Sequence, residues 1–162
     1  MRLLSSSILL SSLVSAFKPL SSRSSFTTNH INHITSRSLT MQSSAILNLS
    51  VIEYESILKS DLKDNYQIID VREPNELELV NIKTDAPVIN LPLSTSDQWT
   101  QSITDGDILD KTKPTICVCH HGMRSQRVAM FLTQQAGFEE VYNLTGGVNE
   151  YANKVDSSIG FY

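Results

Sequence analysis

The chain has 162 residues, of which 40% are hydrophobic, 19% charged and 7% aromatic, and its formal net charge is −4. A protein with several membrane spans would be more apolar, and a fully disordered chain would be more polar, so this composition excludes both classes. The length suits one globular domain.

The first 44 residues differ from the rest in composition. They contain 14 Ser, 4 Thr and four cations, and no acidic residue precedes Glu53. From Ala45 on there are 9 Lys and Arg against 17 Asp and Glu, which gives a net charge of −8. An acidic domain attracts phosphate backbones poorly, so we expect no nucleic-acid partner. The composition therefore divides the chain into a leader at 1–44 and a folded domain at 45–162.

The leader carries two targeting signals in series, and we expect it to be disordered. The short apolar run Leu3–Val14 ends in Val14-Ser15-Ala16, as in a secretory signal. The stretch Phe17–Ser44 is Ser-rich, cationic and free of acids, as in a transit peptide. With Phe17 directly after the small residues, this order resembles the bipartite plastid leader of diatom-like algae. It predicts a plastid protein, with a mitochondrial presequence, a plain secretory signal and an untargeted disordered tail as alternatives.

The folded part begins with a strand and a capped helix. Ser50 followed by Glu53 forms a capping box, which predicts a helix from Val51 to about Lys59 with Ile52, Ser56 and Leu58 near one face. Gly137 supplies the left-handed residue that ends a longer helix over Ser125–Ala136. A last helix follows Gly146-Gly147, with Val148 and Tyr151 facing inward.

Apolar runs alternate with these helical patterns along the whole folded part. In chain order, the predicted strands are Ile46–Leu49, Tyr66–Val71, Val88–Leu91, Thr115–Cys119 and Glu140–Leu144, and two further helices follow Pro74 and span Ser96–Ile103. Continuous apolar strands separated by helices are typical of a parallel sheet that is covered on both faces. The sequence therefore predicts an α/β domain with a small, mainly parallel five-stranded sheet and helices on both faces.

One loop combines several groups that suit a reactive thiolate. The segment Cys119-His120-His121-Gly122-Met123-Arg124-Ser125 joins a buried strand to an amphipathic helix, where ligands of such sheets bind. The N-terminus of a helix favours the thiolate form of a cysteine, and Gly122 lets the backbone curl into an anion-binding nest. Arg124 and Arg127 lie in the first turn, where cations are unfavourable. We therefore expect the loop to hold an anion, either the thiolate or its adduct, with Arg124 facing it.

Three motifs resemble the single-domain rhodanese-like sulfurtransferases. The loop CHHGMRS resembles their C-x-x-G-x-R-S, IIDVREPNE resembles their D-V-R-E-x-x-E, and GFEEVYNLTGGV resembles their last strand and turn, followed by a tail, VDSSIGFY, found in many members. The resemblance covers roughly Leu49 to Tyr162. Val80–Pro87 replaces the usual G-H-I-P-G-A, and Tyr151 stands for the usual Trp of the last helix.

The resemblance implies sulfur transfer through a persulfide on Cys119. Thiosulfate or a persulfide would donate the sulfur, and cyanide, glutathione or a protein thiol would accept it, without a metal or an organic cofactor. The residues His120 to Ser125 would form the binding loop, and Asp70 and Arg72 would support it from the adjacent strand end. Both histidines are largely neutral near pH 7.5, which predicts weak use of thiosulfate and a protein or persulfide donor. Nothing in the sequence demands more than a monomer.

Several alternatives remain beside this prediction. Cysteine phosphatases and arsenate reductases need five residues between Cys and Arg, whereas only four separate Cys119 from Arg124. A zinc site is disfavoured because His120 and His121 are adjacent and point apart, and we expect Cys117 to be a buried strand residue. Asp70 and Arg72 could form a purely structural ion pair. The domain could also be a catalytically weak rhodanese-like module that binds or regulates a partner.

Overall fold

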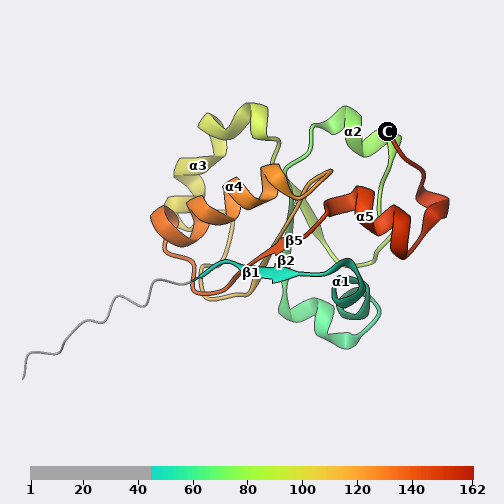
Figure 1. Ribbon diagram of the computed structural model, residues 1–162. Coiled ribbons are helices and arrows are strands. Elements are labelled where there is room, and N and C mark those ends of the chain that lie inside the picture. The colour runs from blue at the N-terminus through green and yellow to red at the C-terminus, as the bar shows by residue number, and fades with distance from the viewer. Residues whose placement is uncertain (1–44) are drawn as a thin grey trace, which may run out of the picture. The chain divides into compact units, whose positions relative to one another are not determined.

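The computed structural model describes residues 45–162 (Figure 1). The predicted leader at 1–44 lies outside the described residues. Within residues 45–162, no helix has both the length and the apolar character of a membrane span.

Five parallel strands form one sheet, as predicted. They are β1 (Leu47–Leu49), β2 (Gln67–Asp70), β3 (Val88–Asn90), β4 (Thr115–Val118) and β5 (Val141–Leu144), in the order β1-β5-β4-β2-β3. Every strand pairing is parallel, and Asp70 of β2 is in register with Val118 of β4. The carboxyl ends of these two neighbouring strands therefore lie side by side, and the segments that follow them meet at one edge of the sheet.

Helices cover both faces of this sheet (Figure 1). They are α1 (Val51–Leu58), α2 (Pro74–Leu79), α3 (Ser96–Asp105), α4 (Met123–Phe131), which continues as a π-helical turn over Leu132–Ala136, and α5 (Gly147–Lys154). Short 3-10 turns span Asp61–Asn65, Leu93–Thr95 and Ser157–Ile159. The predicted capping box of Ser50 and Glu53 is present, and Gly137 ends the helical run with a φ of 79°.

Two apolar clusters fill the space between the sheet and its helices. One contains Ile69 and Cys117 of the sheet with Trp99 of α3 and Val128 of α4. The other contains Ile68 and Ile116 with residues of α1 and α5, including Val148 and Tyr151 as predicted. Neighbouring strand residues thus point into opposite clusters, which follows from the period of two in a strand.

One predicted helix face was wrong in part. Of the predicted residues, Ile52 is 54% exposed and Ser56 is also exposed, whereas Leu58 is buried with Val51 and Tyr54 on the inward face of α1. The buried set follows the spacing of three and four residues that brings side chains to one side of a helix. Tyr54 packs edge to face against Tyr151 of α5, so the aromatic ring takes the inward position in place of Ile52.

Candidate active site

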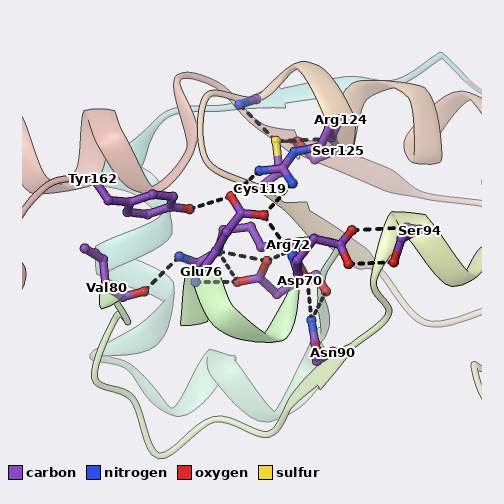
Figure 2. Close-up of polar contacts among 12 residues, drawn as sticks. Asp70, Arg72, Glu76, Val80, Asn90, Ser94, Cys119, Arg124, Ser125 and Tyr162 are labelled. Atoms are coloured by element: carbon purple, nitrogen blue, oxygen red, sulfur yellow. Dashed lines mark hydrogen bonds and ion pairs between the residues drawn. The ribbon is translucent and has the colours of Figure 1, made fainter. Parts of the chain in front are cut away.

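Cys119 directly follows β4, and its thiol lies inside the loop that leads to α4. The residue is only 1% exposed. The Sγ atom accepts hydrogen bonds from the backbone N–H groups of Gly122 at 3.2 Å and Ser125 at 3.3 Å (Figure 2). The Ser125 hydroxyl oxygen lies 3.3 Å from the same sulfur. These donors form a nest around the sulfur, which stabilises negative charge there.

Two glycines let the loop pack closely against the start of α5. Gly122 has a φ of 84°, and a Cβ atom there would lie 3.0 Å from the backbone N of Gly146. The packing is closer at Gly147, because a Cβ atom added there would lie 2.2 Å from the carbonyl oxygen of Cys119. The N–H groups of Val148 and Asn149 donate at 3.0 Å to the carbonyls of Cys119 and His120. The free N–H groups at the start of α5 therefore hold the cysteine loop in place.

A buried serine and asparagine extend the hydrogen bonding behind the sulfur. Ser125 is fully buried, and its hydroxyl donates to Oδ1 of Asn143 at 2.6 Å. A hydroxyl has a single hydrogen, so it donates either to Asn143 or to the sulfur of Cys119 at one time. Asn143 was not predicted as a site residue, although it lies in the segment GFEEVYNLTGGV.

The guanidinium of Arg124 binds a carboxylate that the sequence analysis did not assign. Its two terminal nitrogens donate to the two carboxylate oxygens of Glu76, each at 2.6 Å (Figure 2). This pairing lowers the pKa of Glu76 to about 2 and raises the pKa of Arg124. Arg124 was expected to face an anion on the loop, but both terminal nitrogens bind Glu76. Glu76 is the last residue of the motif D-V-R-E-x-x-E, so this motif could have identified it as a site residue.

Asp70 and Arg72 form a buried ion pair with one another. Arg72 is 1% exposed, and its Nε and Nη2 donate to the Asp70 carboxylate at 2.7 to 3.0 Å. Arg72 Nη1 donates to the carbonyl of Val80 at 2.8 Å, and the amide of Asn90 donates to the carbonyls of Asp70 and Arg72. This pair therefore joins the end of β2 to the segment after α2 and to β3. The contacts fit the structural alternative for these residues.

Aromatic rings line one side of the loop. The side chains of His120 and His121 were expected to point apart, but this was wrong: their rings stack with centroids 3.9 Å apart. The ring of Tyr162 stacks on His120 at 4.0 Å. The Tyr162 hydroxyl donates to Oε1 of Glu76 at 2.9 Å. Desolvation and the neighbouring His121 lower the pKa of His120, which favours the neutral form of this ring. Met123, the first residue of α4, has a side chain that is 71% exposed.

The second cysteine lies outside this arrangement. Cys117 is fully buried in the apolar cluster beside α3 and α4, and burial raises the pKa of its thiol. Both cysteines are free. Across residues 45–162, no group of three or more His, Cys, Asp and Glu side chains has the arrangement to hold a metal ion.

The sequence and the fold are similar to those of known proteins. Residues 55–154 match the sequence profile of the Rhodanese-like domain. The chain is 43% identical over 100 residues to the Rhodanese-like/PpiC domain-containing protein 12, chloroplastic, of Arabidopsis thaliana; this covers 61% of the chain and 31% of that protein. The chain thus spans about a third of this relative's length.

Two further proteins match along most of their own length. Thiosulfate sulfurtransferase GlpE of Coxiella burnetii is 34% identical over 94 residues, which covers 58% of this chain and 75% of GlpE. The crystal structure of the single-domain sulfurtransferase RDL2 of Saccharomyces cerevisiae superimposes with a TM-score of 0.57 at 19% identity, covering 72% of this chain and 97% of RDL2. At that identity the structural match concerns the fold alone.

Proposed function

The chain belongs to the rhodanese-like domain family, and on this premise we propose that it is a sulfurtransferase that carries sulfane sulfur as a persulfide on Cys119. The observation that carries the proposal is the pair of backbone N–H groups that donate to Sγ within 3.3 Å, with the Ser125 hydroxyl oxygen also 3.3 Å from the sulfur. Donors fixed in this way stabilise an anionic sulfur without rearranging during the reaction. The sulfurtransferase relative GlpE supports the same activity class.

The proposed reaction has two displacement steps at sulfur. The Cys119 thiolate attacks the outer sulfur of the donor, the donor's S–S bond breaks, and its electron pair leaves with sulfite or with a thiolate. Cys119 then holds the transferred sulfur as Sγ–S⁻. A thiolate or cyanide attacks this terminal sulfur, the persulfide bond breaks, and the electron pair returns to Cys119. No oxidant or reductant is consumed in either step.

The charges around the loop favour a thiol-borne persulfide as donor over thiosulfate. Glu76 neutralises Arg124, Asp70 neutralises Arg72, and the lowered pKa of His120 favours its neutral form. Thiosulfate carries two negative charges within one small ion, next to the sulfur that is transferred, whereas a thiol-borne persulfide carries at most one there. A site with little compensating charge therefore binds the reacting end of thiosulfate less well. We therefore expect kcat/KM to be lower for thiosulfate than for a persulfide such as glutathione persulfide.

Intact mass spectrometry tests the activity directly. After incubation with glutathione persulfide or thiosulfate, we expect a mass increase of about 32 Da, one sulfur atom, on the wild-type chain. Cys117→Ser should keep the adduct, because Cys117 is buried away from the loop, and Cys119→Ser should lose it. No adduct on the wild type with either donor would favour a binding module without turnover. An adduct that persists on Cys119→Ser would place the reactive sulfur elsewhere.

For the leader at 1–44 we propose import into a plastid. Its Ser-rich, acid-free composition supports this destination, and so does the similarity of the folded domain to a protein named as chloroplastic. Residues 1–44 fused to a fluorescent protein should accumulate in plastids of a diatom-like alga. Fluorescence in mitochondria or in the medium would identify one of the alternative signals instead.

A further inference from the structure

The segment that follows α5 folds back to the site and brings Tyr162 to its rim, by which we mean the stacked rings of His120, His121 and Tyr162. Val155 and Ile159 pack against the apolar cluster on the α1 and α5 side of the sheet, which fixes the course of this segment. The end of the described chain lies beside α2 (Figure 1). There the Tyr162 hydroxyl donates to Glu76, which lies 86 positions earlier in the sequence (Figure 2).

Tyr162 contacts two groups that decide the charge of the site. Its ring lies 4.0 Å from that of His120, with 15° between the ring planes, and covers the histidine. Its hydroxyl occupies Oε1 of Glu76, the oxygen that also accepts from Arg124. Tyr162 therefore bridges the histidines of the cysteine loop and the carboxylate that neutralises Arg124.

We propose that Tyr162 is a specificity-determining residue of this site, because its ring keeps the rim uncharged and so favours thiol-borne persulfides over the thiosulfate dianion. This inference rests on the proposed sulfurtransferase function. Since Cys119 is 1% exposed, a donor must pass the rim to bring its outer sulfur to Sγ. The charge of the rim therefore acts on every donor before the chemical step.

The physical link is the hydration of His120. An imidazole that is covered on both ring faces, here by His121 and Tyr162, loses the water that would stabilise its protonated form. The titratable and charged groups that bear on His120 are His121, Glu76, Arg124, Arg72 and Tyr162. Glu76 and Arg124 neutralise one another, as Asp70 does for Arg72. Removing the Tyr162 ring exposes one face of His120 to water, so its pKa should rise and a positive charge should form at the rim below neutral pH.

A matched pair of variants separates the ring from the hydroxyl. Tyr162→Leu removes the ring, whereas Tyr162→Phe keeps the ring and removes only the hydroxyl, with its bond to Glu76 and its interaction with Arg72. Phe161→Leu, at a neighbouring side chain that is 57% exposed, is the control for loss of an aromatic residue. For each variant, kcat/KM is measured at pH 6 and pH 8 with thiosulfate and with glutathione persulfide, and cyanide is the acceptor. The His120 pKa is followed by NMR titration of its ring protons.

For Tyr162→Leu we expect the thiosulfate to persulfide ratio of kcat/KM to rise about fivefold at pH 6 and little at pH 8, because one added unit charge attracts the dianion more strongly. The His120 pKa should rise in the same variant. Tyr162→Phe and Phe161→Leu should keep both the ratio and the pKa close to wild type.

An unchanged donor ratio in Tyr162→Leu, with the persulfide still forming on Cys119, overturns this inference and leaves the proposed function intact. The same holds if Tyr162→Phe changes the ratio as much as Tyr162→Leu, since the hydroxyl would then be responsible. Absence of a persulfide on the wild type with every donor overturns the proposed function and this inference together.

Discussion

Around Cys119, single carboxylates determine how much positive charge the loop presents. Arg124 and Arg72 would each provide a cation for an anionic donor, but each is bound by an acidic partner, Glu76 or Asp70. The sulfur is left to neutral donors from the backbone and from Ser125. Neutral N–H groups stabilise a sulfur anion of any origin, so they support the persulfide without favouring a highly charged donor.

The Glu76–Arg124 pair should make stability depend on pH in the acid range. Glu76 has its pKa lowered from 4.5 to about 2 in the folded state. A depressed folded-state pKa gives stabilisation that is fully present above pH 4.5 and is lost as the pH falls toward 2. Glu76→Gln should therefore lower the free energy of unfolding by about 1–3 kcal/mol at pH 7. The difference from wild type should shrink steadily between pH 4.5 and pH 3.

Urea denaturation at pH 7, 5, 4 and 3 measures this difference. Glu78→Gln changes an exposed carboxylate of the same helix and should stay within about 0.5 kcal/mol of wild type. A deficit in Glu76→Gln that is the same at pH 7 and pH 3 would show that shape, and not charge, accounts for the loss.

Asn143 should stabilise the domain through the Ser125 hydroxyl. Both residues are buried, and their oxygens are 2.6 Å apart. Asn143→Ala removes the acceptor and leaves a buried hydroxyl with only the sulfur beside it, which should cost about 1–3 kcal/mol. Asn48 is in register with Asn143 on the neighbouring strand but is exposed, so Asn48→Ala should cost less than about 0.5 kcal/mol. Equal losses in chemical denaturation would show that the Ser125 contact contributes nothing specific.

Some of these contacts could be predicted from the sequence and others could not. Cys119, Gly122 and Ser125 were identified because they are local and their spacing has a chemical meaning. Glu76 and Asn143 lie 48 and 18 positions from their partners Arg124 and Ser125, and no local pattern reports such a pairing. The pairings arise because β2, β4 and β5 are neighbours in the sheet, which is a property of the whole fold.

At the scale of elements, the start of α5 and the cysteine loop act as one unit. The first N–H groups of α5 bond the carbonyls of Cys119 and His120, so the helix end supplies donors to the loop and the loop satisfies the helix. The sequence predicted both elements and their order. It placed the start of α4 at Ser125, two residues late, because the capping residue Gly122 has no side-chain signal. The 3-10 turns and the π-helical turn were not predicted, since such short segments follow tertiary packing more than local preference.

Gly147→Ala should break this unit. The added Cβ would lie 2.2 Å from the carbonyl oxygen of Cys119, and the backbone φ is 61°. Gly137 has a similar φ of 79° but open space around its Cβ position, so Gly137→Ala measures the conformational cost alone, about 1–2 kcal/mol. Gly147→Ala should lose clearly more stability than this control in urea denaturation and should also form less persulfide on Cys119. Equal losses in the two variants would show that the loop yields to the methyl group without cost.

At the scale of the whole domain, the sheet separates two apolar clusters that share no side chains, and the strands β2, β4 and β5 contribute residues to both. Ile68 contributes to the cluster with α1 and α5, and Ile69 contributes to the cluster with α3 and α4. Both side chains are at most 1% exposed. The sequence predicted this arrangement from the continuous apolar strands, since a strand that is apolar at successive positions must be covered on both sides.

The two layers should therefore unfold together, and the single tryptophan can show it. Trp99 belongs to the α3 and α4 layer, where its Nε1–H donates to the carbonyl of Pro92. Ile68→Val removes one methylene group from the opposite layer and should cost about 0.5–1.5 kcal/mol. In a two-state domain this loss must shift the unfolding transition seen by Trp99 fluorescence as far as the one seen by far-UV circular dichroism. Ile69→Val, in the layer of Trp99 itself, provides the matched comparison and should shift both signals together as well. A fluorescence transition that stays in place in Ile68→Val while the circular dichroism transition moves would show that the layers unfold separately, and the sheet would then be a boundary between two cooperative units.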